Sequence, residues 1–180
     1  MTGEQLRREY LEIRSKLVSV YQERARLPYA NLAKGTEGTE KCGSKGIRGL
    51  EEANEQISLA KDKLAKLCEA ARAVGKPLKL EAVAQECELS EIEKEILIVL
   101  LMKDAGPGCS GGQTYPTGSE LLRLFYRHDF EILEARRLLY PDAPLRRNNL
   151  ITVEDYAESV LNCTFRVPEQ MIRRLLEHDA

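Results

Sequence analysis

The stretch GTEKCGSKG (residues 38–46) comes close to a phosphate-binding P-loop, whose pattern is G-x-x-x-x-G-K-[ST]. Its two glycines have the required spacing, but the last two positions are exchanged, as Ser44 and Lys45. A P-loop also needs a strand that delivers the glycines to a helix N-terminus, whose amides hold the phosphate. A helical pattern that ends at Pro28 precedes this stretch instead. We therefore interpret it as the tip of a helical hairpin and not as a nucleotide site.

A second stretch, GCSGG (residues 108–112), satisfies the G-x-S-x-G pattern of a hydrolase nucleophile elbow. In that motif a strand runs directly into the serine and a helix leaves at once. Here other residues separate the motif from both neighbouring elements, and the chain shows too few strand patterns for a hydrolase sheet. We interpret Ser110 and Cys109 as parts of an inter-helix loop. The alternative, a serine hydrolase centred on Ser110, is excluded if Ser110→Ala leaves ester turnover unchanged.

Metal ligands and export signals lack their usual patterns. The five cysteines contain no C-x-x-C pair, and the two histidines, His128 and His178, have no ligand spacing with them. The N-terminus has no apolar segment of a secretory signal, and the longest apolar run (96–102) has seven residues, too few for a membrane span. We expect a cytoplasmic protein with reduced thiols, and no catalytic residue, metal or cofactor in this chain.

Charge is distributed unevenly along the 180 residues. Residues 1–77 carry 15 Lys and Arg against 11 Asp and Glu, whereas residues 78–180 carry 12 against 18. An acidic second half is a poor match for a phosphate backbone, which demands a basic face. The difference between the halves also suggests that they are separate modules.

Three arginine pairs interrupt the acidic half, at residues 136–137, 146–147 and 173–174. They could contact the phosphates of DNA. They could equally be ion-pair partners of nearby glutamates on solvated helix faces. Because acidic residues surround them, DNA binding is the less favoured interpretation.

The first module has the pattern of two long helices. Apolar residues over 6–27 recur at spacings of three and four, which predicts a helix of some 24 residues. Thr2 and Gln5 are placed to form a capping box at its start. A second seam, over residues 50–74, repeats every seven residues and has small residues at half of its positions.

These two seams predict an antiparallel helical hairpin, coiled-coil-like, over residues 1–77. Its tip would be the glycine-rich segment 28–49, and Gly75 and Pro77 would end the second helix. The competing interpretation is that one or both seams pair with another chain. Either arrangement would bury the same apolar faces.

The second module begins with several helical patterns. A short helix is expected over 80–87, and a capping box of Ser90 and Glu93 then starts a second one. The apolar run of that second helix could by composition be a buried strand, but the cap favours a helix. A third helix is expected to open at Ser119, and a further helical pattern covers residues 130–139.

Two short alternating runs follow, over residues 150–153 and 163–167. They predict a small antiparallel pair of strands whose connection forms a wing. A closing helix over 168–177 starts with a proline, which the first turn of a helix tolerates. Helices, a two-stranded wing and a closing helix together predict a winged-helix-like domain over residues 78–180.

Three segments of this module, residues 86–97, 140–151 and 165–176, resemble the N-terminal winged-helix region of prokaryotic AAA-family ATPases. The resemblance covers about residues 80–178. In that family such a domain precedes the ATPase module, so the resemblance implies that the ATP-binding module is absent from this chain. The glycine-rich segment 106–118 would then be an insertion.

We therefore expect a mainly α protein with a non-catalytic function, as a protein-interaction or adaptor domain of an AAA-family ATPase. Its partner would be a protein or the ATPase module, with no membrane contact, and Arg146 and Arg147 at the base of the wing are the expected partner contacts. The helical seams could also form a homo-oligomer. The alternative is a winged-helix DNA-binding transcriptional regulator that dimerises through the helical hairpin.

Overall fold

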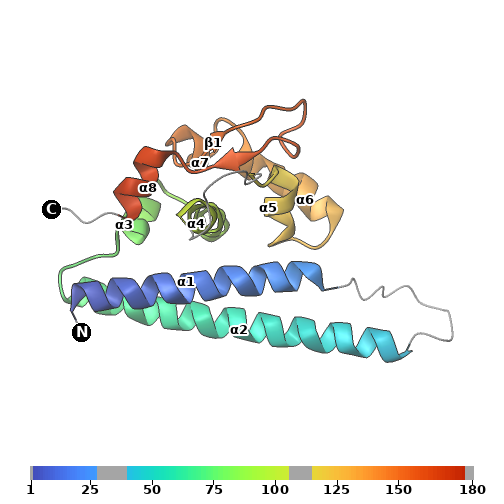
Figure 1. The fold of residues 1–180 in the computed structure, drawn as a ribbon, viewed down its shortest axis with the longest axis horizontal. Helices are drawn as coiled ribbons and strands as arrows, with labels where there is room; N and C mark the ends of the chain where they lie inside the picture. The colour runs from blue at the N-terminus through green and yellow to red at the C-terminus, as the bar shows by residue number, and fades with distance from the viewer. Residues whose placement is uncertain (1, 28–39, 106–114, 177–180) are drawn as a thin grey trace. The chain divides into compact units, whose positions relative to one another are not determined.

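The computed structural model describes residues 2–27, 40–105 and 115–176, and these residues are mainly helical (Figure 1). The chain divides into two compact units, Met1–Glu69 and Ala70–Ala180. The predicted fold class, a helical hairpin followed by a winged-helix-like domain with a two-stranded wing, is confirmed. The predicted module boundary after residue 77 stays a prediction.

Helix α1 (Gly3–Arg26) starts with the predicted capping box. The Thr2 amide donates to Oε1 of Gln5 (2.8 Å), and the Gln5 amide donates to Oγ1 of Thr2 (3.3 Å). These two bonds satisfy amides that have no partner within the helix. Of the predicted apolar seam, Leu6, Tyr10 and Leu17 are buried, whereas Ile13, Val20 and Leu27 are only half-buried. Val18 and Tyr21, which were not part of the predicted seam, are buried as well.

Helix α2 (Glu40–Ala73) begins well before the start of its predicted seam. The interpretation of residues 38–46 and 28–49 as a hairpin tip is therefore wrong for residues 40–49, which are helical, whereas residues 28–39 lie outside the described part. Glycine inside a helix costs only about 1 kcal/mol relative to alanine, so Gly43 and Gly46 did not end this one. A continuous helix from Glu40 also has no P-loop turn.

Helices α1 and α2 lie side by side and antiparallel (Figure 1). Nη1 of Arg24 donates to Oδ1 of Asn54 (3.3 Å), and Leu27 lies beside Gly49, where a Cβ would be 3.4 Å from its Cδ2. The α2 seam is buried at Ala53, Ile57, Leu64, Leu67 and Ala71, as its heptad pattern predicted, whereas Val74 is exposed. The hairpin thus closes within one chain.

The second unit contains the remaining elements in a compact arrangement. They are α3 (Lys79–Glu86), α4 (Glu91–Ala105), α5 (Gly118–Arg123), α6 (Asp129–Ala135), the 3₁₀-helix η1 (Arg136–Leu139), α7 (Pro144–Arg147), β1 (Thr152–Val153), β2 (Phe165–Arg166) and α8 (Glu169–Leu176). Helix α4 runs through the core, and its residues 96–101 are all buried. The predicted capping box is present, because the Glu93 carboxylate accepts from both the amide (2.9 Å) and the hydroxyl (2.7 Å) of Ser90.

Strands β1 and β2 pair antiparallel, with Thr152 opposite Arg166 and Val153 opposite Phe165. The other edge of this segment is occupied too, since Thr117 forms an isolated bridge with Thr164. The Phe165 amide donates to the carbonyl of Pro116 (3.0 Å). The chain around β2 is therefore the middle of three hydrogen-bonded segments.

Two details of the second unit differ from the prediction. Thr117, and not Ser119, caps α5, because its side chain and that of Glu120 form the capping box. The helix predicted over residues 130–139 changes at Arg136 from α6 to η1, and α7 was not predicted. Within the described residues, no helix is both long and apolar enough to cross a membrane.

Candidate interaction surface

Helices α5 and α6 form a helix pair, and α6, the second of the two, comes before the wing in the chain (Figure 1). Its N-terminus is held by Glu131, whose carboxylate accepts from the backbone amides of Arg127 (3.3 Å) and His128 (3.1 Å). It packs against α5 and continues into η1. In helix-turn-helix proteins the second helix of such a pair is the one that enters a DNA groove.

The two sides of α6 and η1 differ sharply in burial. Ile132, Ala135 and Leu139 are buried in the core of the unit. Phe130 and Leu133 lie on the other side, with exposed fractions of 69% and 50%. Large apolar side chains exposed in this way at a spacing of three are typical of a protein contact.

Charged residues lie at both ends of this exposed side. Asp129 precedes Phe130, while Arg136 and Arg137 follow in η1, and all three are exposed. We call the set Asp129, Phe130, Leu133, Arg136 and Arg137 the α6 face. Asp129 forms an exposed ion pair with Arg123 (3.0 Å), the kind of pair that contributes little to stability. Neither Arg136 nor Arg137 pairs with an acidic side chain of the described residues.

The wing (residues 154–164) presents acidic and aromatic groups. Glu154 forms an ion pair with Arg166 (2.8 Å) and Asp155 accepts a hydrogen bond from the Thr164 hydroxyl (3.2 Å). Tyr156 is 80% exposed. An acidic wing would meet DNA phosphates with the wrong sign of charge.

The inner side of the wing is fastened by a buried thiol. Sγ of Cys163 accepts from the Ala157 amide (3.3 Å) and lies within donor reach of the carbonyls of Ala157 (3.6 Å) and Ser159 (3.5 Å). Cys163 therefore has a structural role within the described wing.

The two arginines predicted as partner contacts lie at the end of α7. Arg146 is partly buried, and its Nη1 donates to the carbonyl of Leu139 (3.3 Å), the last residue of η1. Arg147 is exposed. Arg146 is thus engaged in a hydrogen bond within the domain. Contact of Arg146 or Arg147 with a partner stays a prediction.

The third arginine pair, Arg173 and Arg174, lies in the last turn of α8, and both residues form ion pairs. Arg173 forms an ion pair with Glu169 (3.2 Å), one turn earlier, and Arg174 with Glu86 of α3 (2.9 Å). These are the ion-pair partners that the sequence offered as the alternative to phosphate contacts.

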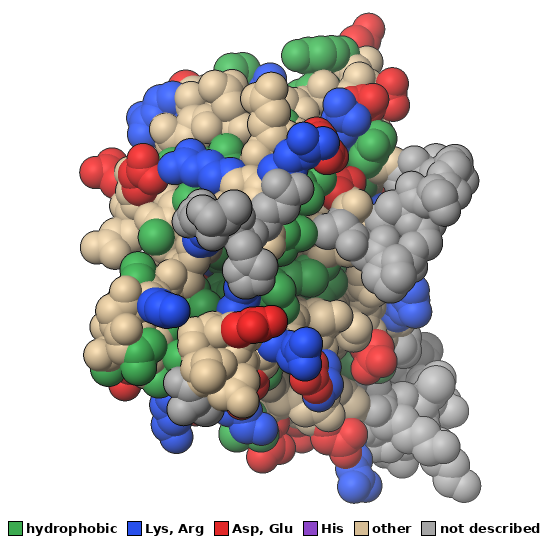
Figure 2. Space-filling view, turned by 60° about the vertical axis from the view of Figure 1, so that its left-hand side comes forward, with side chains coloured by type: hydrophobic (Ala, Val, Ile, Leu, Met, Phe, Trp, Pro, Cys, Tyr) green, Lys and Arg blue, Asp and Glu red, His purple; other side chains and the backbone are tan. Residues whose placement is uncertain are grey.

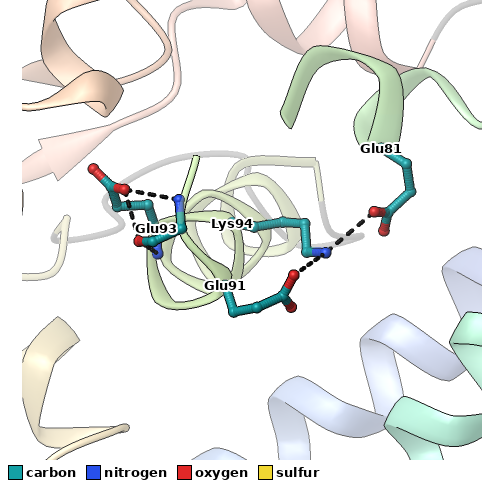
Figure 3. A network of polar contacts seen from close by, with 5 residues as sticks. Glu81, Glu91, Glu93 and Lys94 are labelled. Carbon is teal, nitrogen blue, oxygen red and sulfur yellow. Dashed lines mark hydrogen bonds and ion pairs between the residues drawn. The ribbon is translucent and has the colours of Figure 1, made fainter. Parts of the chain in front are cut away.

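A charged network at the start of α4 joins it to α3 (Figure 3). Nζ of Lys94 lies 3.0 Å from a carboxylate oxygen of Glu91 and 3.2 Å from one of Glu81. Burial lowers the pKa of Lys94, but the hydrogen bonds and charges of these two carboxylates outweigh it and raise the pKa above its ordinary value. Glu93 points away from Lys94, toward its cap partner. This network holds α3 and α4 together.

Among the described residues, no group of three or more His, Cys, Asp or Glu could hold a metal ion. Ser110 and Cys109 lie outside the described residues.

The α6 face was not predicted from the sequence because Phe130 and Leu133 belonged to one helical pattern over residues 130–139, whose two sides were not distinguished. The signal was available, since apolar residues occur on both sides of this short helix. A two-sided apolar helix exposes one side unless another element covers it.

Comparison with known proteins identifies a family for this chain. A family model described as a winged helix domain, variant, matches residues 4–180. The match extends well beyond the resemblance over residues 80–178, so it includes the helical hairpin, and it has no tie to AAA-family ATPases. No curated protein and no solved structure matches the chain.

Proposed function

The chain belongs to the family of variant winged helix domains, and from this membership we propose that it is a non-catalytic protein-interaction domain. Winged helices bind either DNA or proteins, so the choice depends on what the fold exposes. The observation that carries it is the pair Phe130 and Leu133, exposed on the helix that would otherwise enter a DNA groove.

The composition of α6 argues against base contacts. Helices that contact bases in the major groove carry mainly Arg, Lys, Asn and Gln toward the groove. Over its own length α6 presents Asp129, Phe130, Leu133 and Glu134 as its exposed side chains. On the face drawn in Figure 2, Lys and Arg side chains are interspersed with Asp and Glu and form no broad basic area.

A salt titration tests this proposal. The full chain is mixed with a fluorescent DNA duplex, and anisotropy is measured from low to physiological salt. We expect weak binding without a steep salt dependence. A log-log slope of about −4 or steeper would indicate release of several counterions and would overturn the proposal.

The second candidate is a DNA-binding regulator that dimerises through the helical hairpin. It is favoured by Arg136, Arg137 and Arg147, which are exposed on the contacting elements η1 and α7 and form no ion pair with a described acid. The variant Arg136→Glu/Arg137→Glu separates the two functions. DNA affinity falls steeply under the second candidate and is unchanged under the first, with Arg173→Glu as a control.

We further propose that the domain serves as an adaptor of an AAA-family ATPase. The support is the sequence resemblance over residues 80–178, together with the exposed apolar residues of α6 that suit a protein partner. The native coding sequence past codon 180 provides the test. A continuing frame with a strand followed by G-x-x-x-x-G-K-[ST] is the expected result, and a stop codon would contradict it.

A further inference from the structure

We propose that the α6 face binds the α6 face of a second copy of this chain, antiparallel and about a twofold axis. The proposal rests on the proposed function, because it uses this face for a protein contact and names the partner.

The geometry of a helix places all five residues of the α6 face together. At about 100° per residue in α6 and about 120° per residue in the 3₁₀-helix η1, Asp129, Phe130, Arg136 and Arg137 all project within about 80° of Leu133. The buried residues Ile132, Ala135 and Leu139 project to the other side, as their burial shows. The α6 face therefore has an acidic end, an apolar centre and a basic end.

Two copies of this face place opposite charges together only when their helices run antiparallel, because the acidic residue is at one end and the arginines are at the other. Asp129 lies four residues before Leu133, and Arg137 lies four residues after it. With Leu133 on the twofold axis, Asp129 of each copy lies opposite Arg137 of the other. A twofold interface repeats every such contact, so both ends of the contact are satisfied at once. A parallel pair would instead place like charges together.

The apolar centre is suited to the same arrangement. Phe130, three residues before Leu133, lies opposite Arg136 of the other copy, where a guanidinium can stack on the aromatic ring. The two Leu133 side chains meet at the axis and leave water together. The present partner of Asp129 is Arg123, in an exposed pair at 3.0 Å that can be exchanged at little cost.

The size of this contact limits its strength. Two short helical faces bury less than the roughly 1,600 Å² of a standard interface, so we expect a dissociation constant in the micromolar range or weaker. The dimer would form at high local concentration.

Sedimentation equilibrium of the full chain over a wide concentration range tests the proposal. We expect a monomer–dimer equilibrium, and we expect Leu133→Asp to weaken it at least about tenfold because two carboxylates would meet at the axis. The control is Leu59→Asp on α2, since Leu59 is 55% exposed and Leu133 50%. A wild-type chain that stays monomeric, or a Leu133→Asp chain that dimerises normally, overturns the proposal.

A charge exchange tests the antiparallel register. Asp129→Arg and Arg137→Glu should each weaken self-association, because each variant places like charges opposite one another. An equimolar mixture of the two should restore a dimer of one copy of each, and failure to do so overturns the register. Absence of any dimer without DNA binding leaves the protein-interaction function standing with another partner, whereas steep salt-dependent DNA binding removes the function itself.

Discussion

Gly118, at the start of α5, sits where no side chain fits. A Cβ there would lie 2.6 Å from the Val160 carbonyl oxygen and 2.9 Å from Cδ1 of Leu139. We expect Gly118→Ala to lower the free energy of unfolding by about 1–3 kcal/mol, because the wing backbone must move. Urea unfolding followed by circular dichroism measures this change.

The matched control is the same substitution at Gly49, inside α2. A Cβ there would meet only Leu27, at 3.4 Å, which is an ordinary contact. Alanine also has a higher helix propensity than glycine, so Gly49→Ala should raise stability by up to about 1 kcal/mol. Equal effects of the two substitutions would contradict the packing argument.

Because of Lys94, we expect the stability of the second unit to fall at alkaline pH. The pKa of Lys94 is raised above the ordinary value of 10.5 by Glu91 and Glu81, which outweigh the effect of burial. A raised folded-state pKa means that the stabilisation is fully present below pH 10.5 and is lost as the pH rises through the folded-state value.

We expect Lys94→Met to lower the free energy of unfolding at pH 7 by about 1–3 kcal/mol, because it removes the cation between two carboxylates. Urea unfolding of the variant and the wild type at several pH values should show the difference shrinking above pH 10.5. A difference that stays constant with pH would show that packing of the Lys94 stem is responsible.

At the scale of elements, the start of α4 depends on the Ser90–Glu93 capping box. The Ser90 hydroxyl accepts from the Glu93 amide (3.3 Å) and donates to its carboxylate (2.7 Å). Ser90→Ala should cost about 1 kcal/mol of stability, and Ser90→Thr, which keeps the hydroxyl, should cost much less. Thermal unfolding of the two variants checks this, and equal losses would count against the cap.

The sequence predicted elements best where a cap and a periodic seam agree. Thr2 with Gln5 and Ser90 with Glu93 marked the starts of α1 and α4, since such pairs satisfy amides that are free in every helix. The start of α2 was predicted too late in the sequence, because the glycines before residue 50 were interpreted as a loop although the helix continues through them. Helix α7 was missed because four residues are too few for a period to show.

The candidate surface was harder to predict than the fold. The pattern around Phe130 and Leu133 shows that they are apolar but not which side of α6 meets the core. That depends on how α5 packs against α6 and α4, which the apolar spacing of a single helix does not determine. The hydrogen bond of Arg146 to the Leu139 carbonyl depends in the same way on how α7 packs against η1.

For the whole molecule, helix α2 runs across the boundary between the two compact units at Glu69. Ala71, near its end, is fully buried. We expect the units to unfold in one cooperative step, because melting either one ends the helix that both contain. Hydrogen exchange should give similar opening free energies for amides in the middle of α2 and in α4. Separate values would show independent units.

Because the thiol of Cys163 is buried and hydrogen-bonded within the wing, its rate of chemical modification reports how often the wing opens. An alkylating reagent can reach this sulfur, which is 5% exposed as a residue, only when the chain near Ala157 and Ser159 opens. The slow phase of alkylation therefore measures the frequency of that opening, while the less buried Cys68 and Cys87 react first. A ligand that binds the wing would reveal itself by slowing this one modification, without any knowledge of what the ligand is.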